Sequence, residues 1–268
     1  LEAAIVVASV VLLIAAVVAA VVMWKKRTAA KRALKEAPAG AVTLMFTDIQ
    51  GSTALWDQAP TSMAPALAIH NQVIRECIQR VEGYEVKTIG DAFMVAFTHP
   101  VKALKCAVDI QNRLVQSNWP PGLEDVETAC SKRTDAGKLV WRGLRVRIGM
   151  HYGEPGREYN PKMDRVDYLG PPVNLSARTE AKAAGGQIAC TSTLVRELEQ
   201  CKTLELDEIV QMTSLGLHKF KGVTDPQELF GMVPLELVGR EFPPPAKEAT
   251  CDKCLGELTC NACEAQME

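Results

Sequence analysis

The chain has 268 residues and a net charge of -2 at pH 7, with 30 lysines and arginines against 32 aspartates and glutamates. This near balance argues against a nucleic-acid-binding protein, whose affinity would depend on many phosphate contacts. Aromatic residues make up 5% of the chain, so it offers no stacking surface for single-stranded nucleic acid. The length suffices for one well-buried globular domain beside a short apolar segment.

Residues 1–24 are predicted to form a transmembrane helix. Between Ala3 and Trp24 the chain has no charged side chain. About 22 helical residues reach ~33 Å, which matches a hydrocarbon core of ~30 Å. A secretory signal sequence would need basic residues before the apolar run, whereas Glu2 precedes it here. The basic residues at 25–27 follow it instead, as on the cytoplasmic flank of a span. We therefore expect a single-pass membrane protein whose remaining chain lies in the cytoplasm.

Residues 25–40 are expected to form a juxtamembrane linker. Residues 29–36 are strong helix formers, and Pro38 and Gly40 would end that helix. Two interpretations stay open: a helix that passes a signal from the membrane to the domain, or a basic spacer on an anionic leaflet. The chain begins at Leu1 rather than at a methionine, so we expect sequence upstream. An extracellular ligand-binding domain there would fit this arrangement.

Residues 41–240 alternate between predicted strands and helices. Apolar, β-rich runs predict strands at residues 42–47, 84–88, 92–97, 144–150, 187–190 and 228–233. Apolar residues at helical spacing predict helices at residues 61–81, 101–115 and 173–184. This mixture predicts an α+β domain with a mostly antiparallel sheet covered by helices. Residues 119–140 interrupt the pattern with prolines, glycines and many charges, so we expect an inserted subdomain or long loop there.

Residues 241–268 form a cysteine-rich tail. Cys251, Cys254, Cys260 and Cys263 make two C-x-x-C pairs, which suggests a Zn²⁺ knuckle. The five residues between the pairs are fewer than the usual ~12–20, so a palmitoylated or flexible tail stays a competing interpretation. The other five cysteines are scattered through a domain expected in the cytoplasm, and we expect them to be reduced.

Two aspartates occupy predicted strand ends. Asp48 ends the first strand, and Asp91 lies in the tight turn between the next two strands. Neighbouring strands are ~4.8 Å apart, so carboxylates at matching ends could share two Mg²⁺ ions around a triphosphate. A lone aspartate beside a glycine is more often a turn or cap residue. The pair, each member placed after a strand and followed by a helix or turn, is the more specific signal.

Three sequence blocks together resemble the class III adenylate and guanylate cyclases. They read FTDIQGST at residues 46–53, EVKTIGD at residues 85–91 and GPPVNLSAR at residues 170–178. The similarity runs from about Val42 to Val233. It is closest to the receptor-type adenylate cyclases of trypanosomatid parasites, which also combine one membrane span, one catalytic domain and an insertion of this kind. The resemblance implies a ferredoxin-like βαββαβ core, and a place at the plasma or flagellar membrane.

The resemblance also implies roles for residues of the site. Asp48, Asp91 and the backbone carbonyl of Ile49 would bind two Mg²⁺ ions, or Mn²⁺ in their place. Lys87 and Asp167 would read the purine. A lysine can donate to N1 of adenine and a carboxylate can accept from its 6-amino group, whereas guanine presents the reverse pattern. Taken alone, Lys87 could equally be a solvated strand lysine and Asp167 a loop charge.

Two further blocks are implied to bind the ribose and the phosphates. Asn174 and Arg178 are spaced i, i+4 on a predicted helix, so they share one face. The resemblance places Asn174 at the ribose and Arg178 at the phosphate that gathers charge. Lys221 is implied to bind the terminal phosphates. Lys219, two residues away on what we expect to be the same strand face, stays an alternative.

The family forms its site between two domains, one with the metal-binding aspartates and the other with the purine, ribose and phosphate groups. This chain carries both sets in one domain, so we expect a head-to-tail homodimer with two equivalent sites. The function expected is the conversion of ATP to cyclic AMP and pyrophosphate. The alternatives are a guanylate cyclase, a catalytically silent dimerising or nucleotide-binding domain, and a diguanylate cyclase or polymerase palm. The four histidines are isolated in sequence and expected to be structural or exposed.

Overall fold

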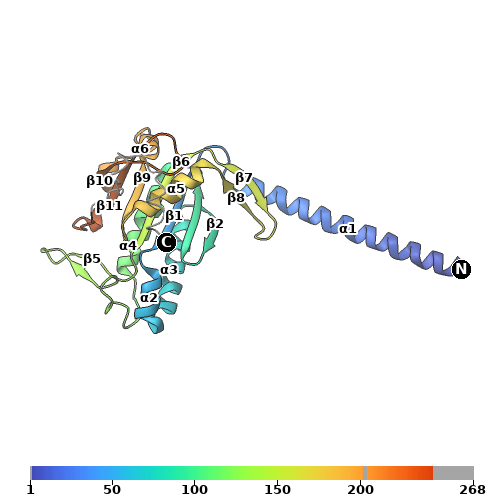
Figure 1. The fold of residues 1–268 in the computed structure, drawn as a ribbon, viewed down its shortest axis with the longest axis horizontal. Helices are drawn as coiled ribbons and strands as arrows, with labels where there is room; N and C mark the ends of the chain where they lie inside the picture. The colour runs from blue at the N-terminus through green and yellow to red at the C-terminus, as the bar shows by residue number, and fades with distance from the viewer. Residues whose placement is uncertain (1, 202–203, 244–268) are drawn as a thin grey trace, which may run out of the picture.

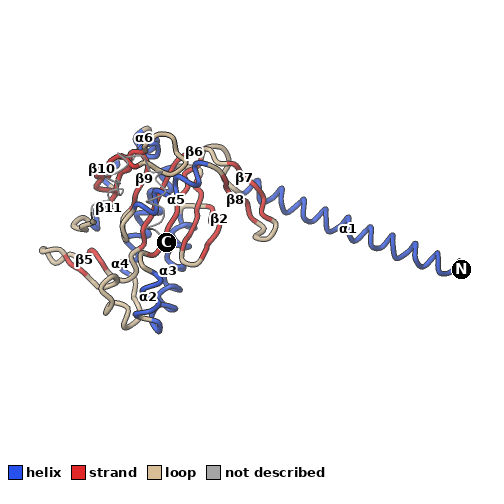
Figure 2. The backbone as a smooth tube through the Cα atoms, viewed as in Figure 1, coloured by secondary structure: helices blue, strands red, loops and turns tan. Residues whose placement is uncertain are grey.

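The computed structural model describes residues 2–201 and 204–243, and for residues 2–16 the backbone alone. One long helix leads into an α+β domain built on a seven-stranded sheet (Figures 1 and 2). The elements are, in chain order, α1 (Glu2–Glu36), β1 (Val42–Ile49), α2 (Ser52–Gln58), α3 (Pro60–Arg80), β2 (Tyr84–Ile89), β3 (Ala92–Phe97), α4 (Pro100–Gln116), β4 (Lys132–Arg133), β5 (Leu139–Trp141), β6 (Val146–Gly153), β7 (Gly156–Asn160), β8 (Arg165–Leu169), α5 (Pro171–Lys182), β9 (Ile188–Thr191), α6 (Ser192–Glu199), β10 (Val210–His218) and β11 (Gln227–Pro234).

The strand order of the main sheet is β10-β11-β9-β6-β1-β3-β2. The pairs of β1 with β3, β1 with β6 and β2 with β3 are antiparallel, and only β6 with β9 is parallel among the described strands. With α3 between β1 and β2 and α4 between β3 and β6, this half is the expected ferredoxin-like βαββαβ core. The remaining strands extend the sheet beyond β6. The expected mostly antiparallel α+β domain is therefore confirmed.

Strand alternation gives the sheet two apolar faces. Met45 and Ile49 of β1 pack in the larger core with α3, α4 and α6. Val42 and Leu44 of the same strand point to the other face, where they pack with the β7–β8 hairpin and the end of α1. Helix α5 covers that second face over β6 and β1. Figure 1 shows the hairpin beside the domain end of α1, whose other end extends far from the sheet.

Helix α1 is continuous from Glu2 to Glu36, so the backbone is helical through the expected span and most of the expected linker. Where side chains are described, the structure contains no helix that is both long and apolar enough to cross a membrane. The expected span over Ala3–Trp24 lies mostly on residues 1–16, outside that part. The cysteine-rich tail also lies outside the described residues. Five free cysteines are found within them, as expected.

The insertion is anchored to the domain more firmly than its composition suggested. Trp119, Leu123, Ala129 and Val140 are buried, and a short β4–β5 hairpin closes it. The chain after β11 then returns to it: the guanidinium of Arg240 donates to the carbonyls of Val140 and Gly186 and to the amide oxygen of Gln111, at 2.7–2.8 Å. The insertion is thus tied to the sheet by a buried polar contact.

Candidate active site

The two predicted carboxylates lie at the same end of neighbouring strands. Thr47 of β1 pairs with Phe93 of β3, so Asp48 is one residue beyond the paired position and Asp91 is two residues before it. Gly90 adopts φ +63°, a left-handed conformation that suits glycine in the tight turn holding Asp91. The strand-end placement predicted from the sequence is therefore confirmed.

A partly buried ionic chain joins Asp48 to helix α5. Arg147 of β6 is directly opposite Asp48 in the strand register, and its Nη2 donates to the Asp48 carboxylate at 2.5 Å. Its Nε lies 2.5 Å from an oxygen of Glu180 on α5. Burial raises the pKa of Glu180 to about 7; Arg147 opposes this shift, while the charges of Asp48 and Asp91 add to it. Glu180 thus lies within the electrostatic reach of both aspartates.

Sequence reasoning missed Arg147 and Glu180. Glu180 follows Arg178 by two residues, so its position next to the GPPVNLSAR block could have marked it as a candidate site residue. Arg147 is opposite Asp48 only because β6 pairs with β1 in this register, which no local pattern reveals.

The aspartates fit a divalent metal site. One carboxylate oxygen of Asp91 is buried and has no hydrogen-bond partner, although buried polar atoms are rarely left unpaired. Mg²⁺ is typically held by one or two carboxylates together with substrate phosphates. Among the described residues no three His, Cys, Asp or Glu side chains gather into a metal cluster. The four tail cysteines of the zinc expectation lie outside that range.

Lys87 and Asp167 are in direct contact, although 80 positions separate them. The Lys87 ammonium donates to both carboxylate oxygens of Asp167, at 2.8 and 2.9 Å. A β-bulge makes this contact geometrically available: Glu85 pairs with Val95, but Lys87 pairs with Met94. The extra residue, Val86, turns Lys87 to the sheet face that carries β8, whereas regular alternation would leave it on the α3 face with Glu85.

Asn174 and Arg178 share the outer face of α5. The helix buries Leu175, Ser176 and Glu180 against the sheet, which leaves Asn174 exposed and Arg178 partly exposed. The Ser176 hydroxyl donates to the Leu44 carbonyl of β1 at 2.8 Å and fixes the helix over that strand. Within the described residues, no hydrogen bond or ion pair joins the side chains of Asn174 and Arg178 to the aspartates or to Lys87 and Asp167.

Lys219 and Lys221 are not on a strand. Strand β10 ends at His218, and both lysines are exposed in the connection to β11. The expectation of a shared strand face was therefore wrong, because the chain turns at Lys221 and Gly222 instead of continuing extended. The structure leaves the choice between the two lysines open.

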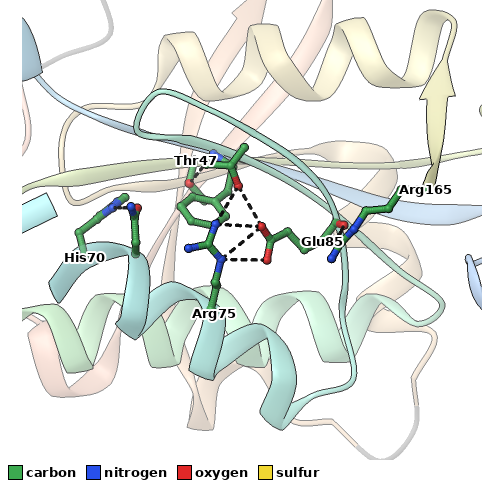
Figure 3. A network of polar contacts seen from close by, with 8 residues as sticks. Thr47, His70, Arg75, Glu85 and Arg165 are labelled. Carbon is green, nitrogen blue, oxygen red and sulfur yellow. Dashed lines mark hydrogen bonds and ion pairs between the residues drawn. The ribbon is translucent and has the colours of Figure 1, made fainter. Parts of the chain in front are cut away.

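A polar network connects α3 to strand β2 (Figure 3). The Arg75 guanidinium donates to the Glu85 carboxylate at 3.1–3.3 Å and lies 5.1 Å from the centre of the Phe93 ring. His70 packs edge-on against the same ring and is fully buried. Burial lowers the pKa of His70 to about 4, against the opposing charges of Asp91 and Asp48. His70 is therefore a buried, neutral histidine within the electrostatic reach of Asp48 and Asp91.

Comparison with known proteins gives consistent similarities. The sequence matches the family described as adenylate and guanylate cyclase catalytic domain over residues 34–228. It is 35% identical over 231 residues to an adenylate cyclase of Neurospora crassa, covering 76% of this chain and 10% of that protein. It is 36% identical over 210 residues to receptor-type adenylate cyclase GRESAG 4.3 of Trypanosoma brucei brucei, covering 72% of this chain and 17% of that protein. The chain thus spans only a small part of these relatives.

The fold is also similar to solved structures. A chain from a structural study of Trypanosoma brucei adenylate cyclases in their monomeric state superposes with a TM-score of 0.67 at 34% identity. The match covers 79% of this chain and 96% of the other. The described fold is therefore shared over nearly the whole length of that chain.

Proposed function

Because the chain belongs to the family of adenylate and guanylate cyclase catalytic domains, we propose that it is an adenylate cyclase, which converts ATP to 3′,5′-cyclic AMP and pyrophosphate. The observation that carries the choice of ATP is the contact between Lys87 and both carboxylate oxygens of Asp167. The ammonium offers a donor and the carboxylate an acceptor at one place, which matches N1 and the 6-amino group of adenine. Guanine would leave both groups mismatched, and an unpaired buried polar group strongly disfavours the wrong substrate.

The carboxylates of Asp48 and Asp91, with the backbone carbonyl of Ile49, would hold two Mg²⁺ or Mn²⁺ ions. When bound, these ions supply positive charge to the triphosphate and lower the pKa of the ribose 3′-hydroxyl. The unpartnered Asp91 oxygen supports this assignment. No dedicated protein base is then required.

The remaining residues orient the nucleotide and stabilise charge. The 3′-oxygen forms a bond to the α-phosphorus while the bond to the pyrophosphate oxygen breaks, and the hydroxyl proton leaves to solvent. Asn174 would hold the ribose, and Arg178 would bond the oxygens that gain negative charge, as a planar guanidinium can do in pairs. Lys221 would bind the terminal phosphates. Positioning and charge stabilisation account for most catalysis of phosphoryl transfer.

We infer that two copies form each site. The exposed outer face of α5, with Asn174 and Arg178, is turned away from the sheet that carries Asp48 and Asp91. A head-to-tail homodimer would let this face complete the site of the partner. Each chain would then give its aspartates to one site and its Asn174 and Arg178 to the other, so the dimer would hold two equivalent sites.

We also infer that the chain is anchored in the plasma membrane by one span, with the domain in the cytoplasm and an extracellular ligand-binding domain upstream. The uncharged run at residues 3–24 and the basic residues after it support this inference. The relatives named receptor-type adenylate cyclases support the link to a receptor.

Mixing two inactive variants tests the shared site. Asp48→Ala and Arg178→Ala chains should each make almost no cyclic AMP from ATP with Mg²⁺ or Mn²⁺. Mixed in equal amounts, they should regain activity, because one mixed dimer keeps one intact site. The measurements are cyclic AMP formation and circular dichroism of each variant. Mixtures that stay inactive while both variants are folded and dimeric would contradict a shared site.

A further inference from the structure

The domain end of helix α1 is fastened to the hairpin that carries Asp167. The last carbonyls of a helix lack partners within the helix. Here the Arg157 guanidinium of β7 donates to the carbonyls of Leu34, Ala37 and Pro38, at 3.4, 3.1 and 3.2 Å. A cation at this position also interacts favourably with the negative end of the helix dipole. Arg157 therefore caps α1 from outside the helix.

A second contact is buried. The Tyr168 hydroxyl of β8 donates to the Pro38 carbonyl at 2.7 Å, and the side chain is fully buried. Burial raises the pKa of this hydroxyl, so it stays a neutral donor. Ala33 and Ala37 on one face of α1 pack into the same apolar cluster as Tyr168. The end of α1 is thus held by both polar and apolar contacts.

The same hairpin is docked on strand β2 on its other side. The Val166 amide donates to the Tyr84 hydroxyl at 2.9 Å, and the rings of Tyr84 and Tyr168 meet edge to face at 6.3 Å. Asp167 lies between Val166 and Tyr168 in β8 and binds Lys87 of β2. Strand β8 therefore connects the helix end directly to the Lys87–Asp167 pair.

We propose that Arg157 and Tyr168 are positioning residues that couple the docking of α1 to the Lys87–Asp167 pair, so that the seating of the helix sets how well the site accepts adenine. The inference rests on the proposed base-reading role of that pair. Tyr168 is adjacent in the chain to Asp167, so a shift of its hydroxyl away from Pro38 moves the strand that carries the carboxylate. The β7–β8 hairpin thus binds the C-terminal end of α1 through backbone carbonyls that have no partner within that helix.

The test uses the full chain and compares two tyrosines of one hairpin. Tyr168→Phe removes the hydroxyl that binds α1, whereas Tyr159→Phe removes a hydroxyl that binds Asp164 within the hairpin. We expect Tyr168→Phe to raise KM for ATP about three- to tenfold, the range for one lost buried hydrogen bond, with kcat changed less than about twofold. The preference for ATP over GTP should fall with it. Tyr159→Phe should leave these values unchanged.

A second pair of variants acts from the helix side. Ala33→Trp places a large side chain in the buried contact, and Lys35→Trp adds the same side chain at an exposed position of α1. Only Ala33→Trp should reproduce the Tyr168→Phe effect on KM and on the ATP preference. Arg157→Lys, which keeps a cation at the helix end, should be milder than Arg157→Gln. Binding of a non-cyclisable ATP analogue to each variant should follow the KM values.

Lys87→Ala separates the two proposals. In the first outcome, Lys87→Ala lowers the ATP preference, but Tyr168→Phe and Ala33→Trp behave like their control variants. The base-reading role then stands and the coupling to α1 is wrong. If Lys87→Ala leaves the ATP preference intact in folded protein, the base-reading role fails and this inference falls with it.

Discussion

At the scale of single residues, two buried histidines make stability depend on pH. His70 is fully buried and His151 nearly so, and burial lowers the pKa of each to about 4. An unfolded histidine has a pKa of about 6.5, so between pH 6.5 and 4 the unfolded chain binds protons that the folded chain does not. The contribution of each neutral histidine is complete above pH 6.5 and is lost as the pH falls toward 4.

We therefore expect each histidine to lower the free energy of unfolding by on the order of 3 kcal/mol as the pH falls from about 6.5 to about 4. Glu180, whose pKa burial raises to about 7, acts in the opposite direction over this window and offsets part of the loss. His70→Leu should remove the contribution of His70, on the order of 3 kcal/mol, as measured by urea unfolding across the range. His99→Asn, at the exposed cap of α4, should keep the full dependence. An unchanged slope in His70→Leu would show that His70 does not resist protonation.

The sequence anticipated the residues whose place follows from a strand end or a motif. Asp48 and Asp91 could be placed because each lies at or just past the end of an apolar strand, and Lys87 and Asp167 because of the blocks near them. The ionic chain through Arg147 and Glu180 could not be foreseen, since it depends on the pairing of β1 with β6 and on the seating of α5.

At the scale of elements, the backbone of α5 packs closely against β6 at Gly149. A Cβ added at Gly149 would be 2.0 Å from the Glu180 amide nitrogen and 2.3 Å from its Cα, so the helix backbone would have to move. We expect Gly149→Ala to lower the free energy of unfolding by about 1–3 kcal/mol, the usual cost of overpacking. Cyclic AMP formation should fall as well, because α5 carries Asn174 and Arg178.

Gly156→Ala is the matched control in strand β7. A Cβ there meets only the Leu169 carbonyl at 3.6 Å, an ordinary contact, so stability should stay within about 0.5 kcal/mol of the parent chain. Urea unfolding and the cyclase assay would be run on both variants. Equal stability of the two would mean that α5 can shift freely over β6.

Long elements with a strong apolar period were predicted well, whereas polar ones and the short amphipathic helix α6 were missed. The spacing of buried residues placed α3, α4 and α5 within a few residues of their observed bounds. The β7–β8 hairpin escaped notice because its strands are rich in charged and polar side chains and pair only with each other. Strand β10 at the sheet edge is largely exposed, so it has no alternating apolar pattern to detect.

At the scale of the whole molecule, the proposed sharing of each site between two copies would make activity depend on protein concentration. We expect the specific activity of residues 25–268 to rise with protein concentration and to follow the dimer fraction seen by analytical ultracentrifugation. The full chain in vesicles should show a weaker dependence, because the proposed membrane anchor would raise the local concentration. Constant specific activity of a species that sediments as a monomer would contradict the two-chain site.

The bulge at Val86 has a consequence for how this protein can change by insertion and deletion. Removing Val86 would place the lysine directly after Glu85, so the lysine would still pair with Met94 and would stay on the sheet face that carries Asp167. The sheet could still form, since the paired positions of β2 and β3 remain. Loss of that one codon would therefore remove the bulge and a buried valine without separating Lys87 from Asp167, whereas loss of a residue on either side of the bulge would change the residue that faces Asp167.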